Sequence, residues 1–436
     1  MIDLTACRRW LAVPLLALAA GALPAFADTT APDTAAPAAA ADTTASPAAG
    51  STDAVPYVLD ARVVGDDSRV RFIADTSLPL DAAVFPLADP YRIVVDLPQV
   101  HFVMPDGTGS QGRSLVSAFR YGLISEGKSR IVMDVTGPVA IDKEFTVPAA
   151  DGQPARLVID LVPSTRDAFL AAAKAYRDSH EAAAEQAPAA QTVAGADDKP
   201  LVVLDPGHGG IDYGARGVDG TDEKDVVLAF AKVLGAKLEA SGRYRVAYTR
   251  TDDSYISLGG RVDIARQQHA GLFVSIHANS FPAGNVSGTI VYTVSDKASD
   301  KAAGDLANSE NQSDALAGID STAEDSDQVK DILADLTRRE TRNFGVVFAQ
   351  TLVKNLGLTT KMFKVPHQEA GFKVLEAPDV PSALIELGYL TNAQDEKQMT
   401  SPAWQSNVAD SMVKAIDGFF AERAAPATAA AASTDP

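Results

Sequence analysis

Four residues of the kinds that bind metals and move protons occupy similar places in this sequence: His208, Glu223, His277 and Glu386. Three of them come at the end of short apolar runs, in the stretches LVVLDPGHGG, LFVSIHAN and SALIELGYLTN, and Glu223 opens a helical pattern after the first run. Short apolar runs of this kind are typical of buried strands. Because the carboxyl ends of strands in an open α/β sheet converge on one rim, we expect these side chains to meet there.

Two imidazoles and one carboxylate on such a rim form a set that binds zinc and leaves a fourth position open. A second carboxylate nearby is a candidate general base for a water molecule. Each residue alone has a plainer explanation, as a polar turn residue, a partner of a helix dipole or a buried paired carboxylate. Three such strand ends in one chain favour the metal site, although Co²⁺ or Mn²⁺ would suit the same ligands.

The residues around these four suggest how the site is supported. Glycines on both sides of His208 allow a sharp turn at the strand end. Asp205 is a candidate acceptor for an imidazole N–H. Asp222 is a candidate N-cap, which places Glu223 in the first turn of a helix. His367 follows a proline, which predicts a loop, and we do not expect it to be a ligand.

The N-terminal segment indicates an exported protein, and the net charge limits its partners. The net charge of −19 over 436 residues argues against a nucleic-acid partner and against anionic membrane surfaces. Residues 1–27 read as a secretory signal, with Arg8 and Arg9 before the apolar stretch Leu11–Leu23, so no transmembrane segment is expected in the mature chain. The arginine pair leaves Sec and twin-arginine export both open. Cys7, the only cysteine, lies within this signal, so any metal must rest on His, Asp and Glu.

Shifts in composition divide the remainder into two folded domains joined by linkers. Alternating polar and apolar residues predict a small all-β sandwich, and alternating strands and helices predict an α/β domain whose open, mostly parallel sheet is flanked by helices. The expected segments are a disordered linker at 28–54, the β-sandwich at 55–163, a helical and disordered linker at 164–198, the α/β domain at 199–423 and a disordered tail at 424–436.

The β-sandwich segment contains a repeated run of the form R-[IL]-V-x-D-L, at residues 92–97 and 156–161. By this run it resembles the AMIN domain found before cell-envelope amidases. The resemblance implies targeting to the division septum through peptidoglycan binding. An inert spacer domain is the alternative, because a fold alone does not establish a function.

Residues 200–423 are similar to the zinc-dependent N-acetylmuramoyl-L-alanine amidases of the Amidase_3 family, through the motifs LDPGHGG, GTDEKDVVL, TRTDD…R, LFVSIHAN and IELGYLTN. The resemblance implies that His208, Glu223 and His277 bind zinc and that Glu386 is the catalytic carboxylate. It also implies a periplasmic enzyme that cuts the amide between N-acetylmuramic acid and L-alanine in peptidoglycan. A zinc peptidase acting within the stem peptide and a non-catalytic wall-binding protein remain the alternatives.

An acidic, helix-compatible insert at about 295–342 is too long for a routine α/β connection. It resembles the regulatory region of division amidases of the AmiB and AmiC type. That resemblance implies a helix that covers the active site, with Glu310 in the open position of the zinc. It also implies release by a LytM-domain activator of the EnvC or NlpD kind. The alternative is a solvated surface helix.

Overall fold

The structure is a computed structural model that describes residues 55–105, 107–125, 127–184, 199–281, 285–319 and 332–424. The expected signal at 1–27, with Cys7, and the linker at 28–54 lie outside the described residues. Residues 185–198 of the second linker, 320–331 of the insert and 425–436 of the tail lie outside them too. Among the described helices, none combines the length and the hydropathy needed to span a bilayer.

The N-terminal domain consists of two sheets with an apolar core between them, which confirms the predicted β-sandwich. One sheet has the strand order β5-β1-β2-β9-β8 and the other β3-β4-β7-β6. The strands are β1 (Tyr57–Asp66), β2 (Arg69–Thr76), β3 (Ala83–Leu87), β4 (Arg92–Pro98), β5 (His101–Phe102), β6 (Val116–Ser125), β7 (Lys128–Val135), β8 (Val139–Val147) and β9 (Ala155–Pro163). Helix α1 follows at Arg166–Ala184, where the composition predicts a helix.

The repeated run of the sequence forms one strand in each sheet, β4 and β9. In β4, Asp96 accepts a hydrogen bond from Arg130 Nε on the neighbouring strand at 2.5 Å. In β9, Asp160 accepts one from Arg71 Nε at 2.6 Å. The repeat therefore marks equivalent strands, each with a carboxylate paired to an arginine of the next strand.

The C-terminal domain is built on a six-stranded sheet of order β11-β10-β12-β15-β13-β14. All neighbouring strands are parallel except β13 and β15, so the predicted open, mostly parallel sheet is confirmed. The strands are β10 (Leu201–Pro206), β11 (Arg245–Tyr248), β12 (Leu272–Asn279), β13 (Thr289–Val294), β14 (Met362–Ala370) and β15 (Ser382–Tyr389). The helices are α2 (Glu223–Ala240), α3 (Leu258–Gln267), α4 (Lys301–Glu310), α5 (Ser313–Leu316), α6 (Ile332–Leu356), α7 (Ala393–Met399) and α8 (Pro402–Ala424), with a 3₁₀ turn, η2, at Lys373–Leu375.

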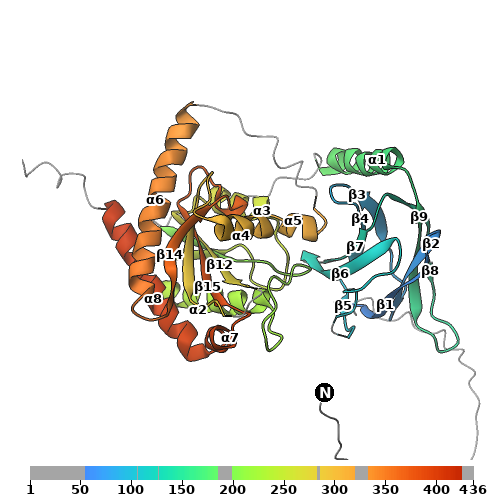
Figure 1. Ribbon diagram of the computed structural model, residues 1–436, viewed down its shortest axis with the longest axis horizontal. Coiled ribbons are helices and arrows are strands. Elements are labelled where there is room, and N and C mark those ends of the chain that lie inside the picture. The colour runs from blue at the N-terminus through green and yellow to red at the C-terminus, as the bar shows by residue number, and fades with distance from the viewer. Residues whose placement is uncertain are drawn as a thin grey trace, which may run out of the picture. The chain divides into compact units, whose positions relative to one another are not determined.

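Helices cover both faces of this sheet (Figure 1). Val202 and Leu204 of β10 pack in a core with α2, α6 and α8, whereas Leu201 and Val203 pack in a second core with α3 and α4. The strands β10, β12 and β15 are buried along their whole length, which explains their continuous apolar character. Because these three strands are parallel neighbours, their carboxyl ends lie together on one rim.

The described part of the insert contains helices α4 and α5 and the first residues of α6. Asp300 caps α4 by accepting a hydrogen bond from the Ala303 N–H at 2.8 Å, and Ala303 and Ala307 pack on the sheet. The helix ends at Glu310, on the rim.

The predicted loop at His367 is wrong, because this residue lies within β14 and its Nε2 is 2.9 Å from Thr293 Oγ1. Pro366 is tolerated there because β14 is an edge strand.

Candidate metal centre

The backbone turns sharply at the end of β10 to present His208. The residue itself has a φ of +57° and Gly209 a φ of +124°, both in the left-handed region. A Cβ atom on Gly207 would lie 2.3 Å from His277 Nε2, so any other residue at this position would displace the His277 ring. The glycines that flank His208 in the sequence therefore have distinct tasks, one for the turn and one for the close contact.

Asp212 orients the His208 ring. Its Oδ2 lies 2.9 Å from His208 Nδ1, and backbone hydrogen bonds between Gly209 and Asp212 close the tight turn that brings the carboxylate back. Burial would raise the pKa of Asp212, but the neighbouring His208 outweighs it and lowers that pKa to about 2. A hydrogen bond from Nδ1 leaves Nε2 as the ring atom free to face a metal.

The interpretation of Asp205 as the partner of an imidazole is wrong. Asp205 is fully buried beneath the His208 turn, and it accepts hydrogen bonds from Thr249, Ser275 and Arg261 instead. Arg261 also donates to the carbonyl oxygen of His208 at 2.8 Å. Asp205 therefore supports the turn through Arg261 and does not contact the ring.

Glu223 is the first residue of α2, as the sequence predicts. Asp222 occupies the N-cap position, but its side chain makes no capping hydrogen bond. The Glu223 carboxylate is held by two backbone N–H groups, with Oε1 accepting from Ala278 and Oε2 from Ala215, both at 2.8 Å. Burial favours the neutral carboxyl, but His208 and His277 outweigh it and hold the pKa of Glu223 well below its usual range.

Glu386 lies on β15 directly beside His277 on β12, because the two residues are partners in the register of these strands. Its side chain is buried, and neither carboxylate oxygen has a hydrogen-bond partner among the described residues. Burial, together with the negative charges of Glu223 and Glu310, raises the pKa of Glu386 well above the usual carboxyl value. A buried carboxylate without partners is costly, which points to a functional role.

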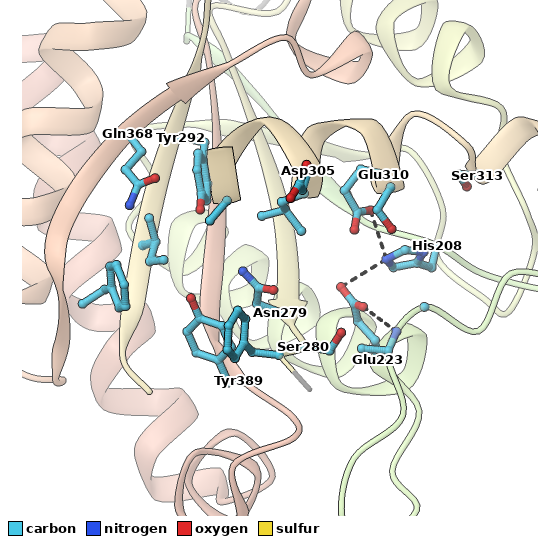
Figure 2. A pocket seen from close by; sticks show the side chains of 18 of the residues that line it. His208, Glu223, Asn279, Ser280, Tyr292, Asp305, Glu310, Ser313, Gln368 and Tyr389 are labelled. Atoms are coloured by element: carbon cyan, nitrogen blue, oxygen red, sulfur yellow. Dashed lines mark hydrogen bonds and ion pairs between the residues drawn. The ribbon is translucent and has the colours of Figure 1, made fainter. Parts of the chain in front are cut away.

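Four atoms meet at the centre: His208 Nε2, His277 Nδ1, Glu223 Oε1 and Glu310 Oε2. Each carboxylate oxygen is 3.1 Å (Glu223) or 3.4 Å (Glu310) from both ring nitrogens. Ligands placed about 2.0–2.1 Å from a tetrahedral zinc ion are separated by roughly 3.3–3.4 Å. These four carboxylate-to-imidazole separations are close to that value, and the ligand atoms of His208, His277 and Glu310 all lie within 4.8 Å of one another. Figure 2 shows Glu310 and Glu223 reaching His208 from different sides.

A cavity of about 660 Å³ continues from this centre along α4 and the carboxyl ends of the strands. Beyond His208 and Glu223, its polar lining includes Asn279, Tyr292, Gln368 and Tyr389, all shown in Figure 2. His367 is not among the residues that line it.

Several supporting residues were not predicted to have these roles. Asp212 gave little signal beyond its place four residues after His208, and Ser313, whose hydroxyl donates to Asp212, lies about a hundred residues away in the chain. The sequence showed the TRTDD…R motif but did not predict what its arginines contact. Arg250 and Arg261 are both buried and donate to the carbonyl oxygens of Pro206, Gly207 and His208.

Comparison with known proteins agrees with this architecture. Residues 202–418 match the family model described as N-acetylmuramoyl-L-alanine amidase, and residues 60–161 match the AMIN domain. The amidase AmiC of Escherichia coli O6:H1 is 34% identical over 388 residues, which cover 86% of this chain and 92% of the relative. AmiC of Neisseria meningitidis serogroup B is 32% identical over 393 residues, with the same two coverages.

A solved structure of the amidase AmiC2 of Nostoc punctiforme is 28% identical, covers 51% of this chain and 97% of that chain, and gives a TM-score of 0.37. The two AmiC relatives match along nearly their whole length, across both domains. The chain belongs to the N-acetylmuramoyl-L-alanine amidase family and carries an AMIN domain before its catalytic domain.

Proposed function

We propose that this protein is a zinc-dependent amidase that hydrolyses the amide bond between N-acetylmuramic acid and L-alanine in peptidoglycan. The observation that carries the proposal is the four-atom cluster, in which each carboxylate oxygen lies 3.1–3.4 Å from both imidazole nitrogens, close to the ligand spacing around a tetrahedral zinc ion. Its ligands would be His208, His277 and Glu223, with Glu310 as a fourth ligand in an inactive state that we call the blocked state. When bound, zinc supplies a Lewis acid that polarises the substrate carbonyl and makes water acidic enough to react near neutral pH.

Glu386 is the proposed general base. It would accept the proton of the attacking water and then deliver a proton to the leaving amine of L-alanine. In support of this, the strand register sets Glu386 beside His277, and neither carboxylate oxygen is engaged in a hydrogen bond with the residues that the structure describes. Its raised pKa suits a group that carries a proton during part of the reaction.

Glu310 is proposed to keep the enzyme inactive. As a fourth protein ligand it would complete a closed tetrahedron and exclude water from the metal, as in structural zinc sites. In support of this, Glu310 Oε2 approaches both histidines at 3.4 Å, and its side chain is only 15% exposed. Burial raises the pKa of Glu310, and the nearby His208 and His277 offset this only in part.

The proposed setting is the periplasm, at the division septum, where the enzyme would remodel the wall and separate daughter cells. The AMIN domain is proposed to bind peptidoglycan there. Release of Glu310 would need a partner, for which we propose a LytM-domain activator of the EnvC or NlpD kind. Such a partner shifts the enzyme to the open state only through tighter binding to that state.

A peptidoglycan-release assay tests the proposal. Purified protein is mixed with dye-labelled peptidoglycan, and zinc content is measured on the same sample. We expect bound zinc, little release by the unmodified chain and strong release by Glu310→Ala. Released intact stem peptides with a free L-alanine amine support the amidase, whereas cuts within the peptide would establish the peptidase instead. Binding without release by any variant would indicate a wall-binding protein.

A further inference from the structure

Two buried polar residues follow Glu310 in the chain. Ser313 and Asp314, which we call the anchor, open the short helix α5 and are 5% and 2% exposed. Polar side chains this deeply buried are stable only with good partners. The partners come from the catalytic domain, at positions distant in sequence.

The side chain of Asp314, from α5, contacts the N-terminus of α3. Its Oδ1 accepts a hydrogen bond from the Tyr255 hydroxyl at 2.6 Å and another from the N–H of Leu258, the first residue of α3, at 2.9 Å. The carboxylate thus takes the place of an anion at a helix N-terminus, where the helix dipole favours negative charge. Hydrogen bonds to a charged group are about twice as strong as those between neutral groups.

Ser313 connects the anchor to the metal centre. Its hydroxyl donates to Asp212 Oδ2, the atom that also contacts His208 Nδ1. The Tyr255 hydroxyl lies 3.1 Å from Ser313 Oγ, so one tyrosine contacts both anchor residues. The anchor therefore reaches His208 through the ring nitrogen that does not face the four-atom cluster.

The contacts of the anchor and the contacts of Glu310 hold the same segment, the junction of α4 and α5. The anchor contacts require no metal. Asp314 follows Glu310 by four residues, and the backbone between them is fixed by the hydrogen bonds that end α4 and begin α5. Asn311, between them, donates to the Gly371 carbonyl at 2.8 Å. The segment can leave the site only when the contacts of Glu310 and those of the anchor both break.

We propose that the anchor is a second lock on the blocked state, formed by Asp314 and Ser313 with Tyr255, Asp212 and the N-terminus of α3. The inference rests on the proposed function, because it adds to the inhibition assigned to Glu310. The anchor holds α4 over the site in the metal-free protein as well, and an activator must displace it along with Glu310. Loss of the metal therefore does not by itself open the site.

The test removes the hydroxyl that contacts both anchor residues. Tyr255→Phe is compared with Tyr244→Phe, a matched control in which a buried tyrosine also loses a 2.7 Å hydrogen bond to a carboxylate, that of Asp417. Hydrogen exchange of the α4 amides is followed in the full-length, metal-free chain. We expect exchange about tenfold faster in Tyr255→Phe and in Asp314→Ala, and unchanged in the control.

Basal peptidoglycan release by the zinc-loaded variants gives a second readout. Tyr255→Phe should raise it about tenfold, and Tyr255→Phe combined with Glu310→Ala should exceed either single change. If Glu310→Ala raises release while Tyr255→Phe changes neither release nor exchange, the anchor is refuted and the inhibition by Glu310 stands. If Glu310→Ala has no effect, the proposed inhibition fails, and exchange in the metal-free protein still decides whether the anchor holds α4.

Discussion

His277 and Glu386 are partners in the register of two adjacent parallel strands, β12 and β15. Adjacent strands lie about 4.8 Å apart and are among the most rigid neighbours in a fold. A proposed metal ligand and the proposed general base are therefore set beside each other by backbone hydrogen bonding rather than by a loop. This placement keeps the proposed base beside the proposed metal ligand whatever the position of helix α4.

Glu386→Gln should abolish turnover without loss of metal. The amide has nearly the same shape but cannot accept a proton, and general base catalysis contributes about 10²–10⁴-fold to rate. The measurement is peptidoglycan release in the Glu310→Ala background, with zinc content determined in parallel. Full activity of the variant would remove Glu386 from the mechanism.

His208→Ala should lose the metal. One of the four ligand atoms disappears, and the remaining three include two carboxylates that repel each other without the ion. Zinc per chain, measured by elemental analysis after gel filtration, should fall from near one to near zero. Unchanged zinc content would contradict the ligand assignment, and a chelator should likewise inactivate the Glu310→Ala enzyme.

Asp212→Ala should weaken zinc binding by about 10–100-fold, the usual cost of losing a group that orients a ligating histidine. Asp212→Asn retains an oxygen that accepts from His208 Nδ1, so its loss should be smaller. Both are compared in the Glu310→Ala background, because Asp212 also binds the anchor. Competition with a coloured chelator gives the affinities, and equal affinities in all three proteins would show that Asp212 has no orienting role.

Asp205→Asn should destabilise the catalytic domain by about 3–5 kcal/mol at pH 7, because it leaves Arg261 buried without its counter-charge. Burial raises the pKa of Asp205, but Arg261 and the hydrogen bonds from Thr249 and Ser275 outweigh it, so the net pKa is lowered from the ordinary 3.8. A lowered folded pKa adds stability above pH 3.8, and this stability is lost as pH falls through the folded value. In urea unfolding, the stability difference between the two proteins should therefore begin to shrink as pH falls below 3.8 and close as pH falls through the lower, folded pKa of Asp205. A difference that stays constant with pH would contradict an ionised Asp205.

The sequence predicted the two fold classes, and it placed His208, His277 and Glu386 on one rim because strand ends leave a local pattern. Glu223 was placed near them by the helical pattern that it opens after the first strand. Apolar runs followed by a polar residue can be read without knowing the tertiary structure. The position of Glu310 could not be read in this way and rested on resemblance alone. Its place at the cluster depends on how α4 packs on the sheet, which is a tertiary contact.

The supporting residues were the least predictable. Asp205 and Asp212 both lie within four residues of His208, and the sequence favoured the wrong one. Only the direction of the turn decides which carboxylate reaches the ring, and that direction depends on a φ of +57° at His208 itself. The anchor joins Tyr255 to residues 58 and 59 positions away through buried polar contacts, and such pairs have no periodicity that marks them.

Mass spectrometry of the fragments released from intact peptidoglycan by the zinc-loaded Glu310→Ala protein tests the central claim most directly. The account predicts complete stem peptides that begin with a free L-alanine amine, together with glycan chains that carry unsubstituted lactyl carboxylates. It also predicts that Glu386→Gln in the same background releases neither. Fragments cut between amino acids of the stem peptide, or release that survives Glu386→Gln, would contradict the account.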